Sequence, residues 1–173
     1  TGAKSDDLKI YRVLFVDDET GIAKIARARN VPVVMDNTWS GGVFFKPFSH
    51  GVDISVQAAT KYIVGHSDVM MGTVTTTEKY WRQVRQAASD LGANSGPEDV
   101  YLAMRGLRTI AVRLRHHQQT ALKLTRWLQK RPEVQRVLYP ALPEDPGHAR
   151  QAALLACQNR PAAYHGRYVI VVD

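Results

Sequence analysis

The sequence predicts an α/β fold in which a mostly parallel or mixed sheet is flanked by helices. Short runs of β-branched and aromatic residues alternate with longer segments whose apolar residues recur every three or four positions, as expected when strands and helices alternate. The run Val31–Met35 is apolar without interruption, which is typical of a strand covered on both faces. A chain of 173 residues is long enough for one compact domain of this kind.

The strands are expected mainly in the first half of the chain. Segments with strand character, in which β-branched or aromatic residues dominate, are residues 10–16, 31–35, 53–57 and 71–77. The acidic residues 17–19 begin a helix that ends near Asn30, between the first two of these segments. Gly41, Gly42 and Pro47 mark a loop before the third.

The second half is predominantly helical. Residues 78–91 have a helical composition, and a break at 92–97 separates them from a longer helical segment. That segment runs from Glu98 to about Lys130, with a kink expected near Gly106, and Pro132 closes it. Residues 134–138 are predicted to form a further strand.

Composition and charge argue against a membrane protein and a nucleic-acid-binding protein. The formal net charge is +7, but the basic residues are spread along the helical segments, so a solvated helix face or attraction for anionic ligands explains it. No apolar run approaches the roughly 20 residues of a membrane span, and no signal-peptide pattern is found at the start, so a cytoplasmic location is expected. Cys157 is the only cysteine, which excludes an intramolecular disulfide and a cysteine-rich zinc site.

An acid and a lysine follow two of the predicted strands. Asp36 comes directly after the strand 31–35, and Thr60 and Lys61 follow the strand 53–57. Ligands of α/β sheets gather at the carboxyl ends of the strands. Pyridoxal phosphate needs a lysine amine, a carboxylate for its pyridine nitrogen, and hydroxyl and N–H groups for its phosphate. These three residues can supply that set, although a capping aspartate and a solvated lysine explain the spacing equally well.

A longer stretch of sequence around Lys61 favours a cofactor site over a capping aspartate and a solvated lysine. It consists of Asp53-Ile54, three further residues, and then Ala-Ala-Thr-Lys-Tyr-Ile-Val-Gly-His-Ser over 58–67. This stretch resembles the pyridoxal-phosphate attachment signature of the cysteine/methionine-metabolism enzymes. The segment 33–38 resembles the strand and pyridine-nitrogen aspartate of the same family, and 106–109 with 113–114 are further similar segments. Within the family, residues 36–39, 53–62 and 108–115 are most similar to the bacterial cystathionine β-lyases.

The resemblance implies a pyridoxal-phosphate enzyme of fold type I, the aspartate-aminotransferase type, that assembles as a homo-oligomer, a dimer or tetramer. It implies α,β-elimination on L-cystathionine, a small amino-acid substrate, to give homocysteine, pyruvate and ammonia. Lys61 would carry the cofactor and act as the catalytic base, Asp36 would bind the pyridine nitrogen, and Thr60 would bind the phosphate. Many relatives have a serine where this chain has Ala58, which leaves more of the phosphate binding to Thr60.

The resemblance covers about residues 20–148, and the ends 1–19 and 149–173 match poorly. We therefore expect residues 1–132 to be a segment of the cofactor-binding large domain and 133–173 to be a divergent or incomplete start of the C-terminal domain. A full-length member is much longer, so weak cofactor binding and slow turnover are expected of this chain alone.

Other functions are less well supported by the sequence. Another transsulfuration enzyme (a cystathionine γ-synthase, cystathionine γ-lyase or methionine γ-lyase) and a non-catalytic remnant both stay open. Residues 13–19 resemble the first strand and acidic pair of a receiver domain, but Asp36 follows too soon to be the phosphoacceptor. No metal site is expected, because His116 and His117 are adjacent on a helix and point apart. Ser40 and Ser67 lack a Gly-x-Ser-x-Gly turn.

Overall fold

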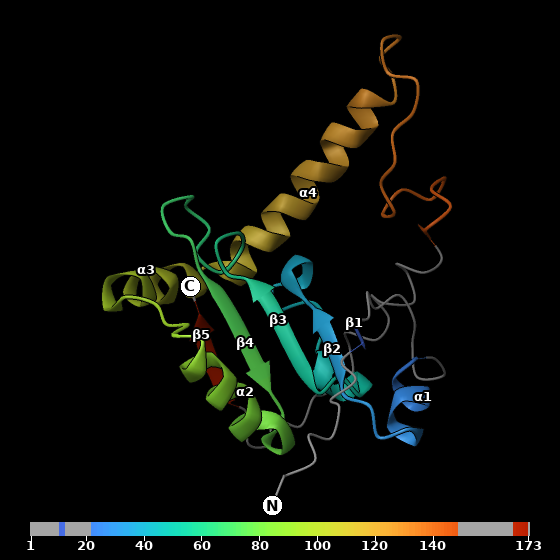
Figure 1. Ribbon diagram of the computed structural model, residues 1–173. Coiled ribbons are helices and arrows are strands. Elements are labelled where there is room, and N and C mark those ends of the chain that lie inside the picture. The colour runs from blue at the N-terminus through green and yellow to red at the C-terminus, as the bar shows by residue number, and fades with distance from the viewer. Residues whose placement is uncertain (1–10, 13–21, 149–167, 173) are drawn as a thin grey trace, which may run out of the picture.

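The computed structural model describes residues 11–12, 22–148 and 168–172, which contain a five-stranded sheet with helices around it (Figure 1). The strands lie side by side in chain order: β1 (Tyr11–Arg12), β2 (Val33–Asp36), β3 (Ile54–Ala58), β4 (Gly72–Thr76) and β5 (Tyr168–Val172). The first three are parallel, β4 is antiparallel to β3, and β5 is antiparallel to β4. Four of the five strands therefore point the same way, which confirms the predicted α/β fold with a mostly parallel sheet.

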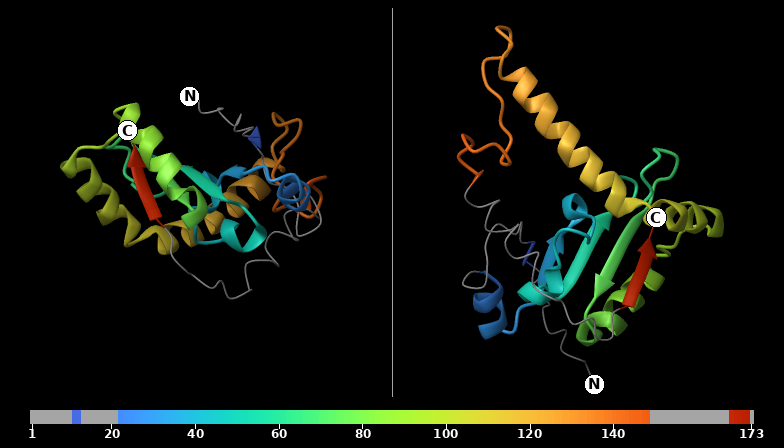
Figure 2. Two further views of the ribbon diagram at one scale, coloured as in Figure 1. Left: turned by 60° about the horizontal axis from the view of Figure 1, so that its bottom comes forward. Right: turned by 180° about the vertical axis from the view of Figure 1, so that it is seen from behind.

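Four α-helices are described: α1 (Ile22–Ala28), α2 (Glu78–Asp90), α3 (Pro97–Leu107) and α4 (Ile110–Leu128). Short 3₁₀ turns, η1 (Thr38–Ser40) and η2 (Pro47–His50), connect β2 to β3. The helix α2 packs against β4 and β5, while α1 lies at the opposite edge of the sheet (Figure 1). The helix α4 begins near the carboxyl ends of β2 and β3 and extends away from the sheet (Figure 2). None of the helices in the described ranges is long and apolar enough to cross a membrane.

Two apolar clusters hold this arrangement together. The first joins β2 to the loop that follows it and to α1, and its buried members are Val33, Met35, Phe45 and Val52. The second lies under the segment after β3 and joins that segment to α3, and its buried members are Ala59, Val64, Val69, Met71 and Ala103. Because burial of apolar area is the main favourable term in folding, the second cluster stabilises the segment that contains Lys61.

Most of the predicted elements in the first half are confirmed. The strands at 31–35, 53–57 and 71–77 and the helix at 78–91 occur with ends shifted by one or two residues, and the helix before Asn30 occurs as α1, while its predicted start at 17–19 lies outside the described residues. For the strand predicted at 10–16, only Tyr11 and Arg12 lie within the described residues. The receiver-like stretch 13–19 and Cys157 lie outside them.

The second half differs from the prediction in three ways. The helical segment predicted from Glu98 to about Lys130 is interrupted more than expected: near Gly106, where a kink was expected, α3 ends at Leu107 and α4 begins in a new direction at Ile110 (Figure 1). Residues 134–138 form no strand, because no strand of the described ranges lies beside them to pair with. The strand β5 was not predicted, although its sequence Tyr-Val-Ile-Val-Val has strong β-propensity.

Candidate functional site

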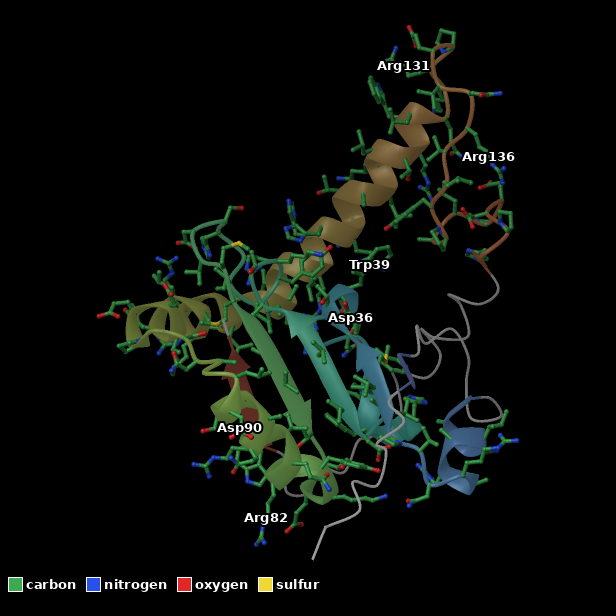
Figure 3. The ribbon with its side chains drawn as sticks, in the orientation of Figure 1. Asp36, Trp39, Arg82, Asp90, Arg131 and Arg136 are labelled. Carbon is green, nitrogen blue, oxygen red and sulfur yellow. The ribbon has the colours of Figure 1, made fainter. Side chains whose placement is uncertain are left out.

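Asp36 is the last residue of β2, and its carboxylate is held by the turn that follows it. Oδ1 accepts a hydrogen bond from the Thr38 backbone N–H at 3.0 Å and another from the Thr38 hydroxyl at 2.6 Å. The same hydroxyl oxygen accepts a bond from the Ala58 N–H of β3 at 2.8 Å. Thr38 is buried, so this chain of bonds fixes the orientation of Asp36 relative to β3. The position of Asp36 at the carboxyl end of β2 is visible in Figure 3.

Thr60 and Lys61 lie in the turn directly after β3. The Lys61 N–H donates to Ala58 O at 3.1 Å, and Lys61 O accepts from the Gly65 N–H at 2.9 Å, so the backbone of Lys61 is bonded on both sides. The Thr60 hydroxyl donates to Met71 O at 3.1 Å and accepts from the Met71 N–H at 2.8 Å. Thr60 thereby ties this turn to the segment that leads into β4. To donate to a ligand, the Thr60 hydroxyl must give up its bond to Met71 O.

The three residues predicted for the site are therefore brought to one edge of the sheet. In the register of the two parallel strands, Asp36 is the partner of Val56, and Ala58 ends β3 two residues later. Lys61 follows Ala58 by three residues, and the Thr38 hydroxyl links the two strand ends. This is the edge at which α/β sheets bind ligands.

An open cavity of about 760 Å³ lies beside Lys61. Thr60 and Lys61 line it from the β3 side, and Arg113 and His117 line it from α4; Asp36 is not part of this wall. The Lys61 side chain is exposed. Asp68, another residue of the wall, forms an ion pair with Arg105 at 2.7 Å. The amine of Lys61 therefore stands at a solvent-filled space large enough for a small organic ligand.

The first turn of α4 holds the backbone after Lys61. Arg113 donates from Nη2 to Tyr62 O at 2.8 Å and to Gly106 O at 2.8 Å, and from Nε to the Thr109 hydroxyl at 3.0 Å. Burial lowers the pKa of the Arg113 guanidinium, which nevertheless stays protonated in the usual pH range.

The roles of two residues, Thr38 and Arg113, were not predicted from the sequence. Thr38 was noted only as part of a similar segment, and its signal was the Asp-x-Thr spacing, which lets a hydroxyl reach back to a carboxylate two residues earlier. Arg113 was noted in the same way. Its target, Tyr62 O, is 51 residues distant in sequence, and no local pattern predicts such a contact.

The other candidate groups lie close to the same site but do not form a second one. His66 contacts the backbone two residues before it, with Nδ1 at 2.7 Å from Val64 O, and the ring centroid of His117 lies 6.1 Å from that of Tyr62. Within the described part of the chain, no group of three or more His, Cys, Asp or Glu side chains gathers in a way that would hold a metal ion.

A lysine and an aspartate at neighbouring strand ends of an α/β sheet are the pair of side chains that pyridoxal-phosphate enzymes use for the cofactor's aldehyde and pyridine nitrogen. A family model described as "Cys/Met metabolism PLP-dependent enzyme" matches residues 12–157, and the chain belongs to this family. Pyridoxal phosphate is the cofactor of this family. The family and the cofactor expected from the attachment signature are thus confirmed.

Two curated relatives in the family are similar to this chain. It is 44% identical over 135 residues to a cystathionine beta-lyase of Haemophilus influenzae, covering 77% of the chain and 34% of that protein. It is 47% identical over 116 residues to a cystathionine beta-lyase of Escherichia coli, covering 67% of the chain and 29% of that protein. These relatives are carbon–sulfur lyases. The chain spans about a third of the length of the curated relatives it matches.

Solved structures of the family have the same fold. A cystathionine gamma-lyase of Lactobacillus plantarum, complexed with L-serine, is 31% identical with a TM-score of 0.72, covering 79% of this chain and 35% of that one. A cystathionine gamma synthase of Xanthomonas oryzae pv. oryzae is 37% identical with a TM-score of 0.70, covering 78% of this chain and 34% of that one. The fold is shared among members with different reactions, so it does not distinguish between them.

The residues at the sheet edge fit the family's cofactor. The exposed Lys61 amine faces an open cavity, and Asp36 presents a carboxylate whose orientation is fixed by Thr38. The chemistry of these donors matches what the cofactor requires: an amine for its aldehyde and a carboxylate for its pyridine nitrogen.

Proposed function

We propose that this chain is the lysine-bearing segment of a pyridoxal-phosphate-dependent carbon–sulfur lyase that acts on L-cystathionine by α,β-elimination. The products would be homocysteine, pyruvate and ammonia. The observation that supports this proposal best is the placement of Lys61 and Asp36 at adjacent carboxyl ends of β3 and β2, in a chain 44% and 47% identical to two cystathionine beta-lyases.

Each residue has a role that follows from its position. The Lys61 amine would hold the cofactor and would also be the base that takes the proton from the substrate Cα. The Asp36 carboxylate, fixed by Thr38, holds the pyridine nitrogen protonated. The Thr60 hydroxyl contributes to phosphate binding by exchanging its bond to Met71 O. When bound, the cofactor supplies the electron sink that stabilises a carbanion.

The role of Lys61 is tested by absorption spectroscopy and peptide mapping. Addition of pyridoxal phosphate should produce a visible absorption band, and reduction with borohydride should then leave the cofactor on the Lys61 peptide. Lys61→Ala should abolish both signals. Lys123→Ala, which changes an exposed lysine of α4, is the matched control and should leave them unchanged. A band that persists in Lys61→Ala would show that another amine carries the cofactor.

The role of Asp36 is tested by rate. Asp36→Asn keeps the size of the side chain and removes its charge, so cofactor attachment to Lys61 should persist while the elimination rate falls about 100-fold or more. Equal elimination rates in the variant and its parent would exclude an electrostatic role for Asp36. Attachment without measurable turnover in the parent itself would support the alternative of a non-catalytic remnant.

The substrate is tested by product analysis. Solved structures similar to this chain include gamma-lyases and a gamma synthase, and one relative, 39% identical over 127 residues, is an L-alanine/L-glutamate racemase of Wolbachia pipientis. Release of homocysteine and pyruvate from cystathionine supports the proposal. Release of cysteine and 2-oxobutanoate would identify a γ-lyase instead, and formation of D-alanine from L-alanine would identify a racemase.

Location and assembly belong to the same proposal. A cytoplasmic homo-oligomer, dimer or tetramer, is what the resemblance implies for the whole protein. Light scattering coupled to size-exclusion chromatography measures the assembly, and a monomer at all concentrations would exclude it for this chain.

A further inference from the structure

The guanidinium of Arg113 joins two separate pieces of backbone, the Lys61 turn and the end of α3, and also binds the Thr109 side chain. Its Nη2 donates to Tyr62 O at 2.8 Å, to Ile63 O at 3.3 Å and to Gly106 O at 2.8 Å. Its Nε donates to the Thr109 hydroxyl at 3.0 Å, which places the bond at the junction of α3 and α4. Bonds from a charged donor are stronger than those between neutral groups.

Two glycines allow close packing in this region, Gly65 against the guanidinium and Gly106 against the backbone of the Lys61 turn. Gly65 has a φ of +76°, and a Cβ at that position would collide with the Arg113 guanidinium. Gly106 is buried in the last turn of α3, and a Cβ there would collide with the carbonyl oxygens of Ile63 and Val64. The backbone around Lys61, the end of α3 and the start of α4 are therefore packed together around one side chain.

Arg113 is also placed beside the lysine itself. It lines the same cavity as Lys61, and the carbonyl that it binds most closely in this turn belongs to Tyr62, the next residue in the chain. Nη1 is buried against Gly65 and, among the residues that the structure describes, has no hydrogen-bond partner. The Nε and Nη2 hydrogen bonds of the guanidinium thus go to the Lys61 turn and to the α3–α4 junction.

We propose that Arg113 is a positioning residue, which fixes the backbone turn after Lys61 and thereby the direction in which the Lys61 amine enters the cavity. The proposal rests on the role of Lys61 proposed above. Arg113 does not touch the reacting atoms. It acts by keeping Tyr62 and Ile63 in place while the Lys61 side chain remains exposed and able to move.

The alternative is that Arg113 only stabilises the fold. The two roles differ in where the structure loosens when the guanidinium is removed. A positioning residue controls the turn locally, whereas a general stabilising residue affects the sheet and the turn together. Amide hydrogen exchange separates these cases and needs no cofactor.

The experiment compares Arg113→Met and Arg113→Lys with Arg115→Met, a change at an exposed arginine two residues further along α4. Exchange is followed at the Val64 and Gly65 amides, which donate to Ala59 O and Lys61 O at 2.9 Å. Arg113→Met should speed exchange at both about tenfold or more, while the amides of β3 and β4 change little. Arg113→Lys should restore part of the protection, and Arg115→Met should leave it unchanged.

The second measurement is the rate at which pyridoxal phosphate attaches to Lys61, read by borohydride reduction and peptide mapping of the whole chain. Arg113→Met should slow attachment about tenfold or more, and Arg113→Lys less. Unchanged exchange at Val64 and Gly65, or equal acceleration in turn and sheet, would overturn the proposal. If no variant attaches the cofactor, the proposed function fails, and the exchange result still decides the role of Arg113. If Arg113→Met does not fold, Arg113→Lys and Thr109→Val provide the same comparison.

Discussion

The contact between α3 and the Lys61 turn can be tested without any ligand by the substitution Gly106→Ala. Gly106 lies in the last turn of α3 and is buried. A Cβ at this position would stand 2.7 Å from the carbonyl carbon of Val64 and still closer to the carbonyl oxygens of Ile63 and Val64. These are backbone atoms, so no side chain can rotate away to make room.

The expected change in stability follows from two opposing effects. Alanine is favoured over glycine inside a helix by up to about 1 kcal/mol. Against this, overpacking costs about 1–3 kcal/mol. Separation of α3 from the turn also weakens the Arg113 bonds to Gly106 O and Tyr62 O, which contribute about 1 kcal/mol each or more. The steric cost is larger, so we expect Gly106→Ala to lower the free energy of unfolding by about 1–3 kcal/mol.

Urea unfolding, followed by circular dichroism, measures this difference directly. With a slope of about 1–3 kcal/mol per molar urea, the midpoint should fall by roughly 0.3–3 M. Gly96→Ala is the matched control, because the nearest atoms to a Cβ there are 3.8 Å and 3.9 Å distant. Gly96 precedes the first turn of α3, so the control should cost no more than about 1 kcal/mol. If Gly106→Ala is as stable as the parent or more stable, helix propensity outweighs the contact and the reasoning is wrong.

Two further substitutions test the surroundings of the site. Thr38→Val removes the bond to Asp36 Oδ1 and leaves the Ala58 N–H without its acceptor, so it should destabilise the chain by about 1–3 kcal/mol in urea unfolding, whereas Thr38→Ser should retain most of the stability. Arg105→Ala breaks the ion pair with Asp68. Because the side chains of Arg105 and Asp68 are 45% and 39% exposed, the free energy of unfolding should change by less than about 1 kcal/mol. A larger loss would show that this ion pair stabilises the cavity wall.

The parts of the fold that the sequence predicted are those decided by local patterns. The uninterrupted apolar run before Asp36 and the β-branched residues of β3 and β4 identify strands without knowledge of their neighbours. Gly106 predicted a kink, but not the full break between α3 and α4, where Gly106 lies against a segment 42 or 43 residues earlier, at Val64 and Ile63. Similarly, residues 134–138 and β5 differ in whether a partner strand lies beside them, and composition does not reveal that.

In the candidate site, too, local patterns predicted some residues, and contacts across the fold determine the others. Asp36, Thr60 and Lys61 were found from the sequence because each follows a strand and belongs to a recognisable stretch. The residues that orient them were not, because their contacts cross the fold: Thr38 reaches Ala58 over 20 residues, and Arg113 reaches Tyr62 over 51. Thr60 was expected to contact a phosphate, and its hydroxyl bonds Met71 in the structure.

Together these contacts hold the backbone around Lys61 from several sides, while the Lys61 side chain is exposed. The Thr60 hydroxyl fixes the turn to the segment before β4, Arg113 fixes it to α4, and the close approach of Gly106 fixes it to α3. A lysine that must bind a cofactor, release it and then take a proton needs a mobile amine on a stationary base, because the amine has to reach different atoms from the same starting point. It follows that substitutions beneath the turn, at residues that touch no reactant, should slow the chemistry of Lys61 more than they disturb the rest of the sheet.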